Sequence, residues 1–109
     1  MGFRPLWRKN APHYNLAAIK EDVRRLGRKA FTKTAGKAGA ELGFSYREMQ
    51  EIVFQLQNTM LYKSMTTYDD HRIWQDVYHT HSQDLEIYIK VTYRPAGGPP
   101  VISFKENNP

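Results

Sequence analysis

One stretch decides the fold of this chain: Asp84-Leu85-Glu86-Ile87-Tyr88-Ile89-Lys90-Val91-Thr92-Tyr93-Arg94. Apolar residues occupy every odd position from Leu85 to Val91, and the residues between them are polar or aromatic. A period of two is typical of a strand that turns one face to a hydrophobic core and the other face to solvent. The stretch therefore predicts a β-sheet with one buried face and one face that is free for chemistry.

Three further strands are predicted on either side of this one. The segments 61–68, 73–79 and 101–106 also have strand character, and turn-rich sequence separates them. Connections this short favour antiparallel pairing between consecutive strands. The second half of the chain is thus expected to form a four-stranded antiparallel meander.

The expected register brings several polar residues together. A four-residue hairpin loop over Thr80–Gln83 would place Gln75 directly opposite Tyr88. A second hairpin, centred on the Gly/Pro-rich segment 95–100, would set Lys105 near Lys90 and Tyr88. Paired amines on one sheet face repel each other, which is tolerable where an anion binds between them.

The first half of the chain has the period of helices. Asn15 is a preferred N-cap, and Gly27 can end the helix that follows it. Ser45 and Glu48, three residues apart, form the pattern of a capping box that opens another helix. A basic, proline-punctuated arm over 1–12 precedes these helices and shows no period.

The segment between the two helices is predicted to hold a short strand over Ala30–Lys33 and then a helix from Thr34 to Leu42. The fold class is therefore α+β, with N-terminal helices packed on one face of a mainly antiparallel sheet. A length of 109 residues fits one domain over 1–109.

Composition narrows the possible chemistry. The chain has no cysteine, which excludes disulfides, thiolate nucleophiles and Cys-based zinc sites and suits a reducing cytoplasm. Residues 1–50 carry eleven Lys/Arg against four Asp/Glu, whereas residues 51–109 carry five against seven. This basic N-terminal half can attract phosphates, dock an acidic protein or serve as a solvated face. No apolar stretch approaches the roughly 20 residues of a membrane-spanning helix, so we expect no membrane association.

The segment 62–78 is dense in amines, hydroxyls, an amide and aromatic rings. Its runs Tyr-Lys-Ser-Met-Thr-Thr (62–67) and Ile-Trp-Gln-Asp-Val-Tyr (73–78), with Ser-Phe-Lys-Glu at 103–106, closely resemble the motility quorum-sensing regulator (MqsR) toxins. The resemblance extends from roughly His13 to Glu106. It implies the microbial ribonuclease or RelE-like toxin fold and the activity of a metal-independent mRNA endoribonuclease (mRNA interferase) from a type II toxin–antitoxin system.

The resemblance also implies a site and partners. The family's proposed active-site residues fall on Lys63, Gln75, Tyr88 and Lys105. Four neighbours are candidates for substrate binding: Tyr62, Met65, Tyr68 and His71. The aromatic rings can stack on unpaired bases and His71 can act as a general acid, although Met65 also suits a core and His71 a surface turn. The family further implies cleavage at GCU-like sites, growth arrest, and neutralisation by a zinc-containing, DNA-binding, MqsA-like antitoxin.

Cleavage of this kind uses the RNA's own 2′-hydroxyl as nucleophile and leaves a 2′,3′-cyclic phosphate and a 5′-hydroxyl. Lys63 or Lys105 can serve as acid or base as well as stabilise charge, and Tyr88 can donate its phenolic proton. His79, His81 and Asp84 imitate a metal cluster, but their spacing is loose, so we expect neither metal nor cofactor. The alternatives are a non-catalytic RNA- or partner-binding domain and a DNA-binding regulator, the latter disfavoured by the lack of a recognition helix beside a tight turn.

Overall fold

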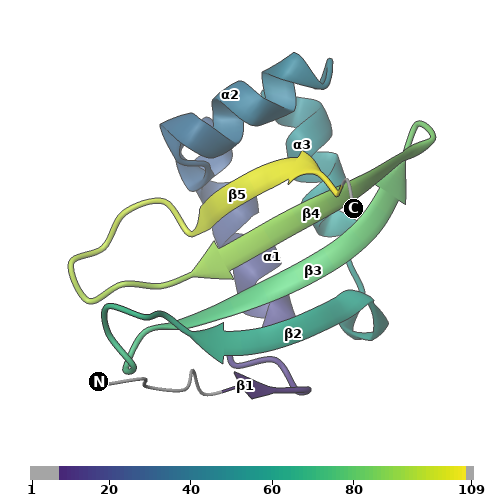
Figure 1. Ribbon diagram of the computed structural model, residues 1–109. Helices are drawn as coiled ribbons and strands as arrows, with labels where there is room; N and C mark the ends of the chain where they lie inside the picture. The colour runs from purple at the N-terminus through teal and green to yellow at the C-terminus, as the bar shows by residue number, and fades with distance from the viewer. Residues whose placement is uncertain (1–7, 108–109) are drawn as a thin grey trace.

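A five-stranded antiparallel sheet with three α-helices on one face makes up residues 8–107, the part of the chain that the computed structural model describes (Figure 1). The helices are α1 (Leu16–Leu26), α2 (Lys33–Glu41) and α3 (Tyr46–Phe54). The strands are β1 (Arg8–Lys9), β2 (Leu61–Thr66), β3 (Trp74–Ser82), β4 (Leu85–Thr92) and β5 (Val101–Glu106). Two short 3₁₀ helices span Gly27–Ala30 and Asn58–Met60. The predicted α+β class is confirmed, with one strand more than expected.

The helix ends follow the predicted signals in α1 and α3. The Asn15 side chain accepts a hydrogen bond from the Ala18 amide at 3.0 Å, and Gly27 ends α1 with a positive φ of 60°. The capping box of α3 is complete, because Ser45 and Glu48 each accept a hydrogen bond from the other's backbone amide. Local side-chain chemistry thus sets where these two helices begin.

The segment before α2 differs from the prediction. A strand over Ala30–Lys33 was wrong, since Phe31 makes only an isolated bridge to Val101. Thr32, not Thr34, caps α2 by accepting a hydrogen bond from the Ala35 amide at 3.1 Å. Ala30 and Phe31 are apolar because their side chains are buried in the core, and this short apolar sequence resembled that of a strand.

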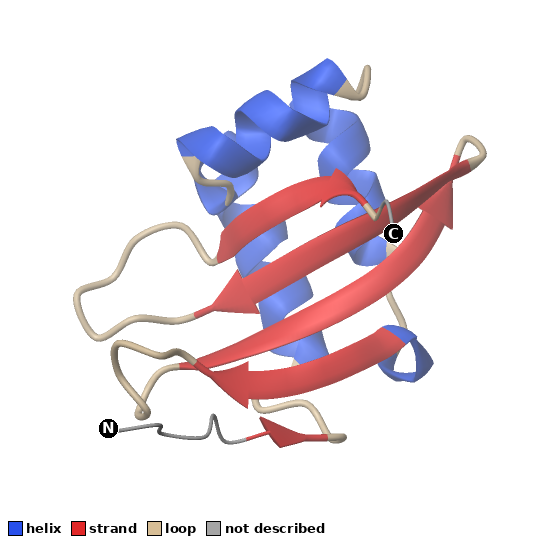
Figure 2. Cartoon of the chain, in the orientation of Figure 1, coloured by secondary structure: helices blue, strands red, loops and turns tan. Residues whose placement is uncertain are grey.

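The core lies between the helices and one face of the sheet. Ile87, Ile89 and Val91 of β4 are fully buried, as the alternation predicted, and Phe104 of β5 joins them. Tyr78 of β3 is also fully buried there. Figure 2 shows all three helices on the same side of the sheet, so none of the three covers the opposite face.

The β3–β4 hairpin is tighter than predicted. Ser82 pairs with Leu85, and the two residues between them, Gln83 and Asp84, have positive φ values of 52° and 66°. Two such residues form the left-handed turn that suits the twist of a hairpin. The four-residue loop expected over Thr80–Gln83 was therefore wrong, and the register shifts with it.

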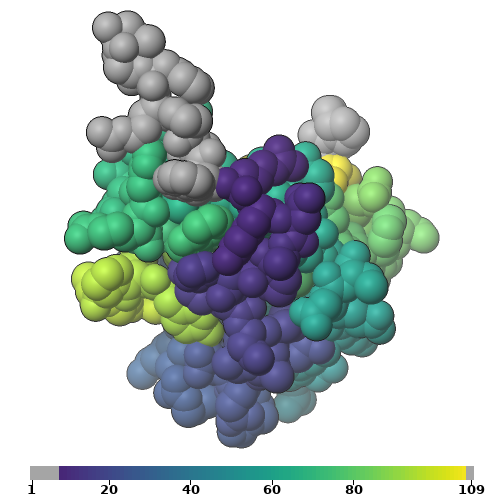
Figure 3. Space-filling model, turned by 90° about the horizontal axis from the view of Figure 1, so that it is seen from below, coloured from purple at the N-terminus to yellow at the C-terminus, as the bar shows by residue number. Residues whose placement is uncertain are grey.

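The start of the described chain is fastened to the edge of the sheet. β1 pairs with β2, which places a fifth strand inside the arm that showed no period. The buried carboxylate of Asp76 accepts hydrogen bonds from the backbone amides of His13 and Tyr14 at 2.8–3.1 Å. The Tyr14 hydroxyl donates to the Trp74 carbonyl at 2.8 Å, and the His13 ring stacks on Trp74 with centroids 4.9 Å apart. Figure 3 shows the start of the described chain, in purple, across the middle of the molecule seen from below.

Phe3 and Trp7, whose packing the sequence left open, lie outside the described residues. Within residues 8–107, no helix is both long enough and apolar enough to pass through a membrane. The three α-helices have 11, 9 and 9 residues.

Candidate active site on the open face of the sheet

The face of the sheet opposite α1, α2 and α3, which we call the open face, carries a row of four aromatic or charged side chains, which we call the aromatic row: Tyr62, His79, Tyr88 and Lys105. His79 pairs with Tyr88, and Tyr88 pairs with Lys105. Tyr62 lies at an irregularity in β2, where its ring stacks on His79 with centroids 4.3 Å apart and planes 14° apart. The row runs across strands β2 to β5, so residues distant in sequence meet on one surface.

Ammonium groups surround Tyr88 in this row. The Lys105 Nζ lies 5.1 Å from the centroid of the Tyr88 ring, and the Lys90 Nζ lies 5.8 Å from it. Burial lowers the pKa of Lys90, because desolvation disfavours its charged form. Two amines around one phenol match the expectation that Lys105 lies near both Tyr88 and Lys90. Within residues 8–107 neither lysine forms an ion pair with a carboxylate, so the two amines make this part of the face positive.

Lys63 joins this surface from β2. It pairs with Val77, which in turn pairs with Lys90, so Lys63 and Lys90 face the same side in the next row of the sheet. The Lys63 Nζ also lies 5.3 Å from the centroid of the Tyr62 ring. Three of the four residues implied by the family resemblance, Lys63, Tyr88 and Lys105, therefore lie on adjacent rows of one face.

Gln75 occupies a different part of the face. It pairs with Thr92 on β4 rather than with Tyr88, because the tight turn at Gln83 and Asp84 moves β4 by four residues relative to the expected register. Four residues separate Gln75 from His79 along β3, which corresponds to about 13 Å in a strand. The predicted Gln75–Tyr88 pair was wrong, and His79 holds the position expected for Gln75.

Gln75 lines a hollow of its own at the end of the sheet. The hollow has a volume of about 330 Å³ and is lined by Thr67, Asp69, Asp70, Ile73, Gln75 and Arg94. One wall of the hollow is the loop after β2, which two hydrogen bonds between Thr67 and Asp70 hold in place. The Thr67 hydroxyl donates to the Asp70 carbonyl at 2.8 Å and accepts from the Asp70 amide at 3.0 Å. Hydrogen bonds from Arg72 hold the pKa of Asp70 below its usual range. Gln75 thus lies in a shaped, polar recess rather than among the lysines.

The predicted substrate-binding residues lie at varied depths. Tyr62 and Tyr68 are 49% and 71% exposed, which is unusual for large aromatic side chains and leaves their rings accessible. Met65 is half-buried and pairs with Gln75, so it lies on the open face rather than in the core. His71 is half-buried, and its Nε2 is buried without a hydrogen-bond partner in the described part of the chain.

Sequence reasoning did not connect His79 with Tyr88. It considered His79 only as part of a loose group with His81 and Asp84, whereas it did expect Lys90 near Lys105 and Tyr88. The odd-position alternation in β3 does place His79 on the face of Gln75, so a correct hairpin length would have identified its contact with Tyr88. Across residues 8–107, no three His, Asp or Glu side chains are grouped closely enough to hold a metal ion.

Comparison with known proteins shows the family of the chain. Residues 11–106 match the family described as "Motility quorum-sensing regulator, toxin of MqsA". The chain is also similar to the mRNA interferase toxin MqsR of Escherichia coli (strain K12), with 37% identity over 98 residues. That alignment covers 90% of this chain and 97% of the relative. The family match over residues 11–106 includes the whole open face described above.

Proposed function

Because the chain belongs to the MqsR toxin family, we propose that its messenger RNA endonuclease activity resides on the open face of the sheet. The protein is an mRNA endoribonuclease toxin. The observation that carries the location of the site is the position of two amines around Tyr88. Lys105, which pairs with Tyr88 across β4 and β5, lies 5.1 Å from the centroid of the Tyr88 ring, and Lys90 of the same strand lies 5.8 Å from it. Clustered amines on an exposed sheet face suit a phosphate that binds between them.

The reaction begins when Lys63 or Lys105, acting as the base, takes the proton of the RNA's 2′-hydroxyl, and the 2′-oxygen attacks the adjacent phosphorus. A P–O2′ bond forms and the P–O5′ bond breaks, so the products carry a 2′,3′-cyclic phosphate and a 5′-hydroxyl. Lys63 and Lys105 stabilise the negative charge that builds up on the phosphorane. The Tyr88 hydroxyl or the Lys105 ammonium supplies the proton that the departing 5′-oxygen takes up.

Gln75 has a recognition role in this proposal rather than a role in bond cleavage. Its distance from the aromatic row, about 13 Å along the strand, places it one or two nucleotides from the reacting phosphate. The hollow around it offers an amide, a carboxylate at Asp69 and a guanidinium at Arg94, which complement the donors and acceptors on base edges. We assign preference for GCU-like sites to this hollow and to the exposed rings of Tyr62 and Tyr68.

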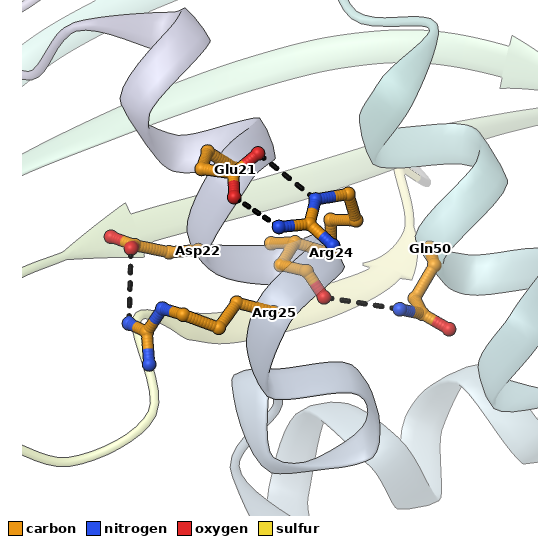
Figure 4. A network of polar contacts seen from close by, with 6 residues as sticks. Glu21, Asp22, Arg24, Arg25 and Gln50 are labelled. Carbon is orange, nitrogen blue, oxygen red and sulfur yellow. Dashed lines mark hydrogen bonds and ion pairs between the residues drawn. The ribbon is translucent and has the colours of Figure 1, made fainter.

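The antitoxin is proposed to bind the basic helical side of the molecule. Arg24 and Arg25 pair with Glu21 and Asp22 on the exposed face of α1, as Figure 4 shows. Exposed pairs three residues apart contribute only a few tenths of a kcal/mol, so a partner's carboxylates can replace them. An acidic segment of an MqsA-like, zinc-containing and DNA-binding antitoxin fits this surface.

This interface is tested by reversing charge. Changing Arg24, Arg25 and Arg28 to Glu should weaken antitoxin binding and make the remaining affinity less sensitive to salt. Calorimetry at two salt concentrations measures both effects, with Lys33→Glu and Lys37→Glu on α2 as a basic control pair. Unchanged binding by the triple variant would place the interface elsewhere.

The activity itself is tested with purified protein and a defined RNA in EDTA. We expect cleavage without divalent metal, with cyclic-phosphate and 5′-hydroxyl ends at sites that share a consensus. Dependence on magnesium, with RNA folding controlled, would refute the mechanism. Binding without cleavage would mean that the protein is a non-catalytic RNA-binding domain of the same fold. We place the reaction in the cytoplasm, where messenger RNA is translated.

A further inference from the structure

His79 lies at the centre of the aromatic row, between two tyrosines that belong to different strands. Its ring stacks on Tyr62 at 4.3 Å and meets the Tyr88 ring at 5.7 Å with a tilt of 41°. Its Nε2 is buried and lacks a hydrogen-bond partner among the described residues. A buried ring nitrogen is normally satisfied, so this position gains from an acceptor that arrives with a ligand.

The charges around His79 favour its neutral form in the free protein. Burial lowers the pKa of His79, and the Lys63 ammonium lowers it further, while Glu86 opposes them. The titratable groups that face it are Tyr62 and Lys63 on β2, His81 on its own strand, Glu86, Tyr88 and Lys90 on β4, and Lys105 on β5. Glu86 is exposed, and its carboxylate lies 3.9 Å from the Nε2 of His81.

A phosphate on this face reverses that balance. An anion held by Lys63 and Lys105 lies beside the imidazole and neutralises the charges that disfavour its protonation. The imidazolium then supplies a further positive charge and two N–H donors where the neutral ring supplies one. We propose that His79 is a phosphate-binding residue of this site and takes up a proton when RNA binds, so that the toxin holds its substrate more tightly as the pH falls below neutrality.

The direction of the effect follows from linkage. RNA that binds the protonated protein better raises the pKa of His79 in the complex above that of the free protein. Affinity therefore increases as the pH falls through the pKa of His79 in the complex, and it levels off below the pKa of His79 in the free protein. Each unit of difference between these two pKa values makes binding tenfold tighter, so a gain in affinity on the order of 10-fold is expected between pH 8 and pH 5.5.

This inference rests on the proposed function, and the experiment separates the two. The probe is a labelled RNA with a single 2′-deoxynucleotide at its cleavage site, which removes the nucleophile but keeps the phosphate. Its Kd is measured from pH 8 to pH 5.5 for the wild type, His79→Gln, His79→Arg and the matched control His81→Gln. Calorimetry in two buffers of different ionisation enthalpy counts the protons taken up.

We expect the wild type and His81→Gln to bind on the order of 10-fold more tightly at the acidic end, with proton uptake on binding. His79→Gln should lose most of this pH dependence, whereas His79→Arg should bind tightly at every pH and still cleave the unmodified RNA. Cleavage by His79→Arg matters because a general base at this position could not be replaced by a permanent cation.

Three results would overturn the inference while leaving the proposed function intact: the same pH slope in His79→Gln as in the wild type, no proton uptake by the wild type, or loss of RNA binding in His79→Arg with its fold retained. If His79→Gln does not fold, the buffer comparison on the wild type and His81→Gln still decides. A wild type that neither binds nor cuts RNA would instead refute the proposed function.

Discussion

Asp76 connects the start of the described chain to the middle of the sheet, and its removal should be strongly destabilising. Its side chain is fully buried, and its carboxylate accepts from the amides of His13 and Tyr14 at 2.8–3.1 Å. In Asp76→Ala these two N–H groups lose their acceptor, and water replaces that acceptor only in part. Each unsatisfied donor costs about 1–3 kcal/mol, and the relief of a buried charge offsets part of the sum.

The expected loss for Asp76→Ala is therefore about 3 kcal/mol in the free energy of unfolding. For a domain of this size that corresponds to roughly 15 °C in Tm. Asp76→Asn keeps one acceptor oxygen and should lose about half as much. Urea denaturation followed by circular dichroism measures both variants, and amide exchange should accelerate first at His13 and Tyr14. Asp69→Ala, an exposed carboxylate in the β2–β3 loop, is the control and should change stability by less than about 0.5 kcal/mol.

The reasoning would be refuted if Asp76→Ala unfolded within about 0.5 kcal/mol of the wild type, the range of ordinary surface changes. It would also fail if the two amides kept their protection in that variant. Either result would mean that β1 and α1 hold the segment 10–15 in place without the carboxylate.

Three further predictions concern the site and the core. Lys105→Ala and Lys63→Ala should each slow single-turnover cleavage by ~10²- to 10⁴-fold, and the double variant should lose much less than the product, because both act on one phosphate; fully multiplicative losses would mean independent RNA contacts. Gln75→Ala should change the sequence preference of cleavage more than the cleavage rate at the preferred site, and sequencing of the RNA ends measures this preference. A lower rate with an unchanged preference would mean that Gln75 takes part in bond cleavage. Burial raises the pKa of Tyr78 from 10.0 to about 12. Because the folded-state value lies above the unfolded one, the stability contributed by the neutral phenol is complete below pH 10 and is lost as the pH rises from about 10 to about 12. Tyr78→Phe, which removes a buried hydroxyl without a partner in the described chain, should flatten that decline in urea denaturation, and an unchanged decline would contradict the assignment.

The parts of the fold that depend on local chemistry were predictable. The cap at Asn15, the capping box at Ser45 and the alternation in β4 each use residues within a few positions of one another, and each is confirmed. β1 has two residues and no period, so only its pairing with β2 across more than fifty residues reveals it. Asp76 likewise looks like any polar strand residue until the amides of His13 and Tyr14 lie against it.

The residues of the candidate site come from the family resemblance, whereas their arrangement could not be predicted. The resemblance proposed Lys63, Tyr88 and Lys105, but the neighbours of these residues depend on the strand register. That register depends on whether Gln83 and Asp84 adopt positive φ values, and neither is a glycine that would have signalled such a turn. Because the turn length sets every pair along a hairpin, the wrong turn length placed Gln75 opposite Tyr88, where the structure has His79.

The short strand β1 also bears on how this protein behaves at high concentration. An unpaired strand edge is a template on which a second chain can add, and long exposed edges lead to aggregation. β1 covers β2 at Ser64 and Met65, and at the other edge the Thr32 amide donates to the Val101 carbonyl at 3.0 Å. Each edge is thus blocked at one point while the broad face between them stays open. A change that detaches the segment 8–14, such as the loss of Asp76, should therefore produce a toxin that self-associates through β2 before it unfolds.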